Sequence, residues 1–208
     1  AEPFQFPARW MIWLISLLFF MSSYAYKDIQ TFGIQIITRS GSRRLWWLSK
    51  TLWCFFGTLL FHTVLWLTVC IACLVTKAEL SLVLHADIIC KLFQTFSTGT
   101  AIGEIQISLL ALLLPVVVSF SLCLCQMTLS LFIKPTLSFL AMAVIAIISV
   151  YLFSPVLLCN YAMPIRTELF MSNGVNVDTG YVYAVSFVLF LILLGALIFN
   201  SYDLINRD

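Results

Sequence analysis

The sequence predicts an all-α membrane protein, a polytopic bundle of helices that cross a bilayer. Its 208 residues are 62% hydrophobic and only 10% charged, whereas soluble domains are about 25% charged. The mean hydropathy is +1.06, and the apolar residues gather in runs close to or above the roughly 20 residues that a spanning helix needs. Five such spans take about half of the chain. We therefore expect one transmembrane domain over residues 1–208, without a separate soluble domain.

Each expected span has its own boundaries. Aromatic residues at both ends of the first run are typical of the two membrane interfaces. The polar pair Lys134-Pro135 separates the third run from the fourth, Pro115 lies inside the third, and Pro155 lies near the end of the fourth. The segment 76–104 is too polar to span, but its apolar residues recur at helical spacing, which predicts a short interfacial helix in part of it. The five spans are expected at about 10–26, 51–75, 105–133, 136–159 and 181–199.

The segment Lys27–Lys50 is the most informative part of the chain. It holds five of the eleven Lys and Arg residues and a single acid, Asp28. Basic connections between spans face the cytoplasm, so this segment orients the chain. Its pattern predicts two short amphipathic helices around a Ser-Gly-Ser break. We expect Asp28 to begin the first helix, and Ser42 to cap a second helix that continues into the next span.

This orientation places the start of the first span outside the cell, although the opening residues do not resemble a secretion signal. We therefore expect a sixth span upstream of Ala1. The seven cysteines have neither metal-site nor disulfide-framework spacing, which favours free thiols. A bridge between Cys90 and Cys159 stays open.

The basic segment resembles the coupling element of permease subunits of ABC transporters in the type-two exporter-like family. In that family the coupling element contains, in this order, an acid, a glycine with an apolar run, an Arg-x-x-Ser-Arg pattern and a lysine before the next span. The stretch LFSPVLLCNYAMPIR and the ending FNSYDLINRD are similar to small permeases of lantibiotic and peptide-antibiotic export or immunity systems. The matching positions are Asp28, Gly33, Ile34–Ile37, Arg39, Ser42-Arg43, and Lys50 before Thr51.

The resemblance implies a function and partners. The chain would be the membrane subunit of an ATP-driven exporter in the bacterial cytoplasmic membrane, moving a hydrophobic or amphipathic cargo such as a peptide. Since the chain contains no phosphate-binding G-x-x-x-x-G-K-[ST] motif, ATP and magnesium would bind two separate ATPase subunits, beside a second, identical or paralogous permease. We expect the ATPase-coupling residues to be Asp28, Phe32, Gly33, Ile36, Arg39, Ser40, Gly41, Ser42, Arg43 and Arg44.

Other functional classes have less support in the sequence. An intramembrane enzyme lacks a catalytic set, and a proton-coupled transporter would need charged residues in the span centres, where none is found. We therefore expect no enzymatic activity and no cofactor in this chain. A non-transporting scaffold or receptor subunit, or an exporter of lipid or lipid-linked molecules, stays an alternative. Four polar residues are candidate cargo contacts, although a lone histidine in a span is more often packed: His62, Gln126, Asn160 and Arg166.

Overall fold

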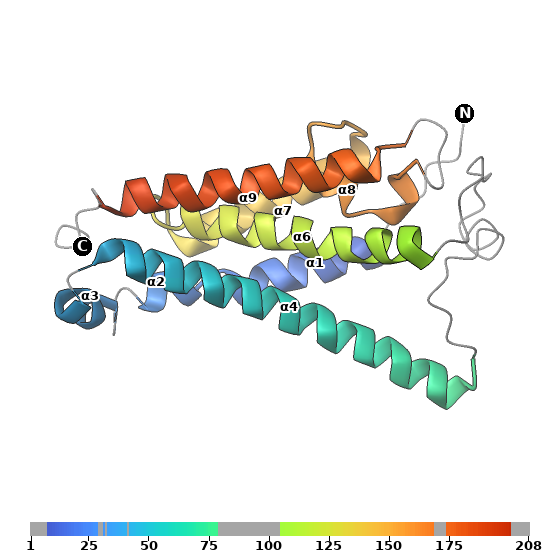
Figure 1. The fold of residues 1–208 in the computed structure, drawn as a ribbon, viewed down its shortest axis with the longest axis horizontal. Helices are drawn as coiled ribbons and strands as arrows, with labels where there is room; N and C mark the ends of the chain where they lie inside the picture. Colours follow the sequence, from blue (N-terminus) through green and yellow to red (C-terminus); the bar gives the residue numbers. More distant parts are fainter. Residues whose placement is uncertain are drawn as a thin grey trace.

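The described part of the protein is built from helices, as a computed structural model shows (Figure 1). The structure describes residues 8–28, 31, 33–40, 42–78, 105–168 and 174–200. Within these ranges there is no β-strand, and a single isolated bridge pairs Thr167 with Val175. The expected all-α class is confirmed. The helices are α1 (Ala8–Met21), α2 (Tyr24–Asp28), α3 (Ile34–Ser40), α4 (Arg43–Thr76), α6 (Ile105–Leu129), α7 (Pro135–Tyr151), α8 (Leu158–Tyr161), the 3-10 helix η2 (Pro164–Arg166) and α9 (Val177–Asn200).

Three described helices are long and apolar enough to cross a membrane. They are α4, the part of α6 from Leu112 to Leu129, and α9 as far as Phe199. They contain or overlap the spans expected at 51–75, 105–133 and 181–199. Helix α7 is apolar as well, but has only 17 residues. The chain thus has the character of a helical membrane protein.

Two expected spans are not single helices. The run 10–26 is divided, because α1 ends at Met21 and α2 starts at Tyr24. Between them the Ser22 hydroxyl donates to the Phe19 carbonyl at 2.8 Å, a local bond that competes with the helical ladder. The run 136–159 is also divided, because α7 ends at Tyr151. Pro155 has no N–H and disfavours helical geometry in the residue before it, so the chain turns before α8 begins.

Helix α4 carries the basic segment directly into the membrane-spanning part, as expected. Ser42 is its N-cap and accepts a bond from the Leu45 N–H at 3.4 Å. The 34 residues of α4 span about 51 Å, which exceeds the roughly 30 Å hydrocarbon core. The helix ends at Thr76, and its C-cap Lys77 has a left-handed φ of 54°. Figure 1 shows the second half of α4 diverging from the other helices.

Helix α6 is the centre of the bundle and packs against α1, α4, α7 and α9. Of its spanning window, 61% is buried, against 11% for α4. Small and polar side chains allow this close packing, as is usual between membrane helices. The Gln126 side-chain amide donates to the Leu18 carbonyl at 3.0 Å, and the Ser138 hydroxyl donates to the Gln126 carbonyl at 2.7 Å. These bonds hold α1, α6 and α7 together.

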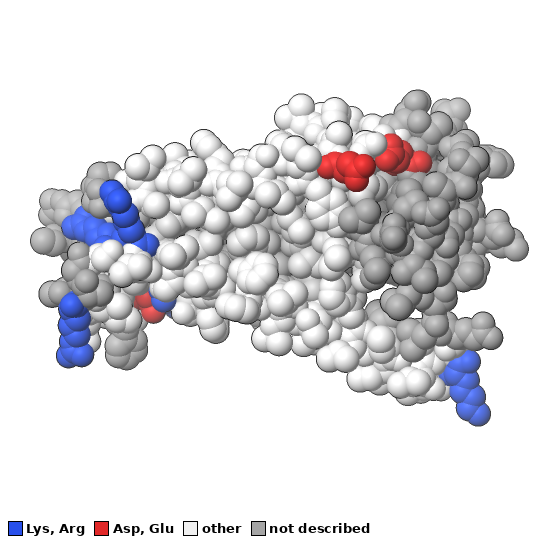
Figure 2. Space-filling view, viewed as in Figure 1, with Lys and Arg blue, Asp and Glu red and all other residues white. Residues whose placement is uncertain are grey.

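Charged side chains lie at the two ends of the bundle, separated by an uncharged middle (Figure 2). One end contains α2, α3, the start of α4, the α6–α7 connection and the end of α9 (Figure 1). In the described ranges this end, called the basic end below, carries Lys27, Arg39, Arg43, Arg44, Lys50 and Lys134 against Asp28. The opposite end carries Arg9, in the first turn of α1, Lys77 and Arg166 against Glu168 and Asp178. The bundle is therefore strongly polarised in charge.

Several sequence predictions lie outside the described residues. They include the interfacial helix expected within 76–104, of which 79–104 is outside, and the Cys90 half of the possible disulfide. Two of the expected coupling residues, Phe32 and Gly41, are outside as well. The cysteines that are described, among them Cys159, are free thiols.

Candidate functional site

The basic segment Lys27–Lys50 is assembled at one end of the bundle from α2, α3 and the first two turns of α4. Its position differs from the sequence prediction in one respect. Asp28 does not begin a helix; it is the last residue of α2. The reason is tertiary, because its carboxylate faces α4, where it finds two partners. Helix α3 then supplies the exposed residues Ile36 and Arg39.

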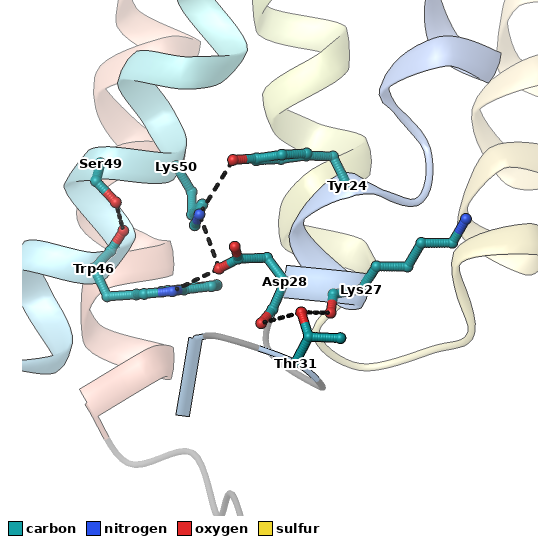
Figure 3. Close-up of polar contacts among 7 residues, drawn as sticks. All are labelled: Tyr24, Lys27, Asp28, Thr31, Trp46, Ser49 and Lys50. Atoms are coloured by element: carbon teal, nitrogen blue, oxygen red, sulfur yellow. Dashed lines mark hydrogen bonds and ion pairs between the residues drawn. The ribbon is translucent and has the colours of Figure 1, made fainter. Parts of the chain in front are cut away.

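Asp28 is the centre of a polar cluster formed with Tyr24, Trp46 and Lys50 (Figure 3). The Lys50 ammonium lies 2.8 Å from Asp28 Oδ2, and the two side chains are 9% and 17% exposed. The Trp46 indole N–H donates to the same oxygen at 3.1 Å. Lys50 also donates to the Tyr24 hydroxyl at 3.3 Å. The four residues, called the Asp28 cluster below, join α2 to α4 through charge-assisted bonds, which are stronger than neutral ones.

Aromatic rings shield this ion pair from solvent. The Lys50 ammonium lies 4.9 Å from the centroid of the Tyr24 ring and 5.4 Å from that of Trp46. Tyr24 stacks in turn on Trp53, with 4.8 Å between the centroids. Cation–π attraction adds to the ion pair when the charge is partly desolvated. The cluster therefore has few alternative arrangements.

Two neighbouring tryptophans connect the cluster to α9. Trp46 stacks on Phe199, with centroids 4.6 Å apart and planes 20° apart. The Trp47 indole N–H donates to the Ile192 carbonyl at 3.0 Å. Gly195 makes room for this ring, since a Cβ there would lie 2.0 Å from Trp47 Cζ2. As a result α2, α4 and α9 are fastened to each other at the basic end.

A glycine allows the chain after α2 to return close to its own path. A Cβ on Gly33 would lie 2.8 Å from the Asp28 carbonyl oxygen. Thr31 donates to the Lys27 and Asp28 carbonyls at 3.0 and 3.4 Å (Figure 3). These contacts hold the chain just ahead of α3 close to Asp28.

The remaining expected coupling residues surround this junction. Ser42 is occupied as the cap of α4, while Arg39 and Arg44 are exposed. Arg43 is half-buried in the first turn of α4. Ser40 ends α3. The basic end therefore combines a rigid interior with a positively charged rim.

The four candidate cargo contacts do not form one site. His62 is buried in α4, where its Nδ1 lies 2.8 Å from the Thr58 carbonyl and its ring meets Trp13 edge-on at 5.0 Å. Gln126 is buried in α6 and bonded to α1. The other two candidates, Asn160 and Arg166, lie together at the opposite end of the bundle.

Asn160 and Arg166 complete the C-terminal end of α7. The Arg166 guanidinium donates to the carbonyls of Ser149 and Val150 and to Asn160 Oδ1. Asn160 donates to the Leu152 and Ser154 carbonyls at 3.1 and 2.8 Å. A cation near the last carbonyls of a helix also interacts favourably with its dipole. Burial lowers the pKa of the Arg166 guanidinium from its ordinary value, but arginine stays charged in proteins. Both residues have structural partners here.

Lys50 belongs to the predicted basic segment, but its pairing with Asp28 was not predicted, and neither Tyr24 nor Trp53 was predicted to be part of a site. A signal existed, because a lone acid and a lysine at the start of an apolar run need each other when both are withdrawn from water. Within the described ranges, no group of three His, Cys, Asp or Glu residues is placed to hold a metal ion.

Comparison with known families assigns this chain to one family. A family model described as "Protein of unknown function (DUF2705)" matches residues 3–205, nearly the whole length. The chain therefore belongs to this family. The searches of curated proteins and of solved structures find no match.

Proposed function

We propose that this member of the DUF2705 family is the membrane-spanning subunit of an ATP-driven exporter. The observation that carries the proposal is the junction at the basic end, where α2, α4 and α9 are fastened through the Asp28 cluster and the neighbouring tryptophan contacts. A permease subunit catalyses no bond chemistry; it must pass motion from a soluble motor to packed helices. The junction has the rigidity that this task needs.

The charge pattern supports the orientation that the proposal needs. Connections rich in Lys and Arg stay in the cytoplasm, and the basic end holds most of the described basic residues. In this orientation Arg39 and Arg44 are presented to cytoplasmic proteins. Two ATPase subunits that bind ATP and magnesium would dock there, and a second permease subunit would complete the complex in the bacterial cytoplasmic membrane.

The proposed cargo is hydrophobic or amphipathic, such as a bacteriocin-like peptide in export or self-immunity. Its support is the apolar and aromatic surface of the helices, together with the resemblance to peptide-antibiotic permeases. Polar or charged cargo would need buried polar groups along a path. The buried polar residues of the described interior are scattered serines and threonines, together with Lys50, His62, Gln126 and Asn160, which bond to the protein itself.

A purification experiment tests the proposal. The tagged chain is coexpressed with an ABC ATPase subunit from the same genome, and the ATPase turnover of the complex is measured in proteoliposomes. Replacing Arg39, Arg43 and Arg44 together by Glu should reduce ATPase binding by at least about tenfold, because attraction becomes like-charge repulsion. The control is Lys134→Glu, an exposed lysine at the same end but on the α6–α7 connection.

The outcomes separate the two function classes. Loss of binding in the triple variant, with the control intact, supports a coupled permease. Unchanged binding and turnover in the triple variant would contradict the proposal and favour a scaffold or receptor subunit.

A further inference from the structure

An apolar groove opens on the side of the bundle, between α4, α6 and α9. It has a volume of about 190 Å³ and is lined by Phe55 and Thr58 from α4, Val117 and Phe120 from α6, and Val188 and Leu189 from α9, among others. The Thr58 hydroxyl donates to the Cys54 carbonyl at 2.8 Å, so it is already satisfied. Phe55 and Leu189 frame the groove and are 42% and 57% exposed. The groove is therefore accessible from the membrane.

The helical register connects this groove to the basic end. Arg44 precedes Phe55 by 11 residues, which is about three turns, so both lie on the same side of α4. The two positions are about 16 Å apart along the helix axis. Arg44 is exposed, and Leu48 between them is exposed as well. One continuous strip of α4 thus leads from a cation to an apolar groove.

This separation matches the dimensions of one membrane leaflet. The hydrocarbon core is about 30 Å thick, so each leaflet contributes about 15 Å. If Arg44 lies at the level of the lipid phosphates, the groove lies where acyl chains run. An anionic headgroup at Arg44 and an acyl chain in the groove can therefore belong to the same molecule.

The groove is narrow, and its accessible lining is apolar. A single flexible hydrocarbon chain suits such a space.

We propose that the groove between α4, α6 and α9 binds an acyl chain of an anionic phospholipid whose headgroup is held at Arg44. The proposal does not depend on a partner ATPase. Moving an acyl chain from the bilayer into the groove exchanges one apolar surrounding for another, so selectivity has to come from the headgroup. One arginine near an anionic headgroup corresponds to a preference of about fivefold.

The test uses the purified full-length chain alone in phosphatidylcholine vesicles. The probe is phosphatidylglycerol with a photoactivatable group in the middle of one acyl chain, and the cross-linked residues are mapped by mass spectrometry. We expect labelling to concentrate at the groove residues of α6 and α9. The same photoactivatable chain on phosphatidylcholine should label them about fivefold less.

Two matched pairs of variants test the two halves of the site. Val188→Phe fills the groove and should reduce its labelling several-fold, whereas Val182→Phe makes the same change at an exposed position of α9 outside the groove. Arg44→Gln should remove the preference for phosphatidylglycerol, while Arg39→Gln, on α3, should leave it unchanged. The helical content of each variant is checked by circular dichroism. If Val188→Phe does not fold, the comparison of Arg44→Gln with Arg39→Gln still tests the proposal.

Three results would overturn the proposal. The first is uniform labelling of all lipid-facing helices, which indicates bulk lipid. The second is equal groove labelling by both lipids. The third is labelling of the groove by a photoactivatable amphipathic peptide but not by the lipid. Because no ATPase is present, none of these outcomes tests the docking of an ATPase at the basic end.

Discussion

The ion pair between Asp28 and Lys50 gives the sharpest prediction about stability. At 2.8 Å and an effective dielectric constant of about 20, the attraction is about 6 kcal/mol before desolvation is subtracted. Since the side chains are only 17% and 9% exposed, each charge has lost most of its water and depends on the other. Removing one partner of such a pair costs about 3 kcal/mol, because the other charge is left uncompensated.

A double-mutant cycle measures this dependence. Lys50→Met keeps the length of the side chain and removes its charge. Asp28→Asn keeps an oxygen that accepts from the Trp46 indole. Each single variant should lower the free energy of unfolding by about 3 kcal/mol. The double variant should cost at least about 1.5 kcal/mol less than the sum, because it leaves no unpaired charge. The free energies come from detergent-induced unfolding in mixed micelles, followed by circular dichroism.

A lysine outside the cluster provides the control. Lys134→Met makes the same change at an exposed position of the same end and should alter the free energy of unfolding by no more than about 0.5 kcal/mol. If the costs of Lys50→Met and Asp28→Asn simply add, within about 0.5 kcal/mol, the two side chains are independent. The reasoning about a junction held by this pair would then be refuted.

Three further predictions use the same unfolding assay. Gly195→Ala should lower the free energy of unfolding by about 1–2 kcal/mol, because the Trp47 indole against Gly195 is held in place by a hydrogen bond. Gly57→Ala should be neutral or stabilising, since only the flexible end of a methionine lies against that position. Equal effects of the two variants would contradict this difference. Arg166→Ala should cost about 2 kcal/mol by uncapping α7, while Lys77→Ala at the same end of the bundle should cost less than about 1 kcal/mol. Asn176→Ala should cost about 1 kcal/mol, since this side chain accepts the N–H groups that start α9 at 2.8 and 3.2 Å; an unchanged unfolding curve would show that the cap contributes nothing.

The junction and the groove share helices α4 and α9, with consequences for the proposed exporter. Helices α4 and α9 are fastened to each other at the basic end, through Trp46 and Trp47, and α4 diverges from the bundle farther along (Figure 1). A push on α3 would therefore rotate α4 about a fixed end. The groove lies between that end and the divergent half, so such a rotation would change its width, although less than the spacing of the divergent half. In the proposed exporter, lipid occupancy and coupling would influence each other.

The amino-acid sequence by itself determined the class of the protein and the location of its most important segment. Apolar runs of sufficient length leave helices as the structure that satisfies their backbone groups in a bilayer, and α4, α6 and α9 follow from that rule. The continuation of the basic segment into α4 after Ser42 was also predictable, because capping is a local interaction.

Only the tertiary structure decided which polar groups meet. The breaks at Ser22 and ahead of Pro155 are local effects, whereas the use of Arg166 as a cap of α7 depends on contacts between distant residues. Asp28 was expected to begin a helix. Instead its carboxylate, withdrawn from water, pairs with the ammonium of Lys50 on another helix. The physical reason is that hydrophobicity acts through composition along the chain, whereas the compensation of a buried charge depends on three-dimensional proximity.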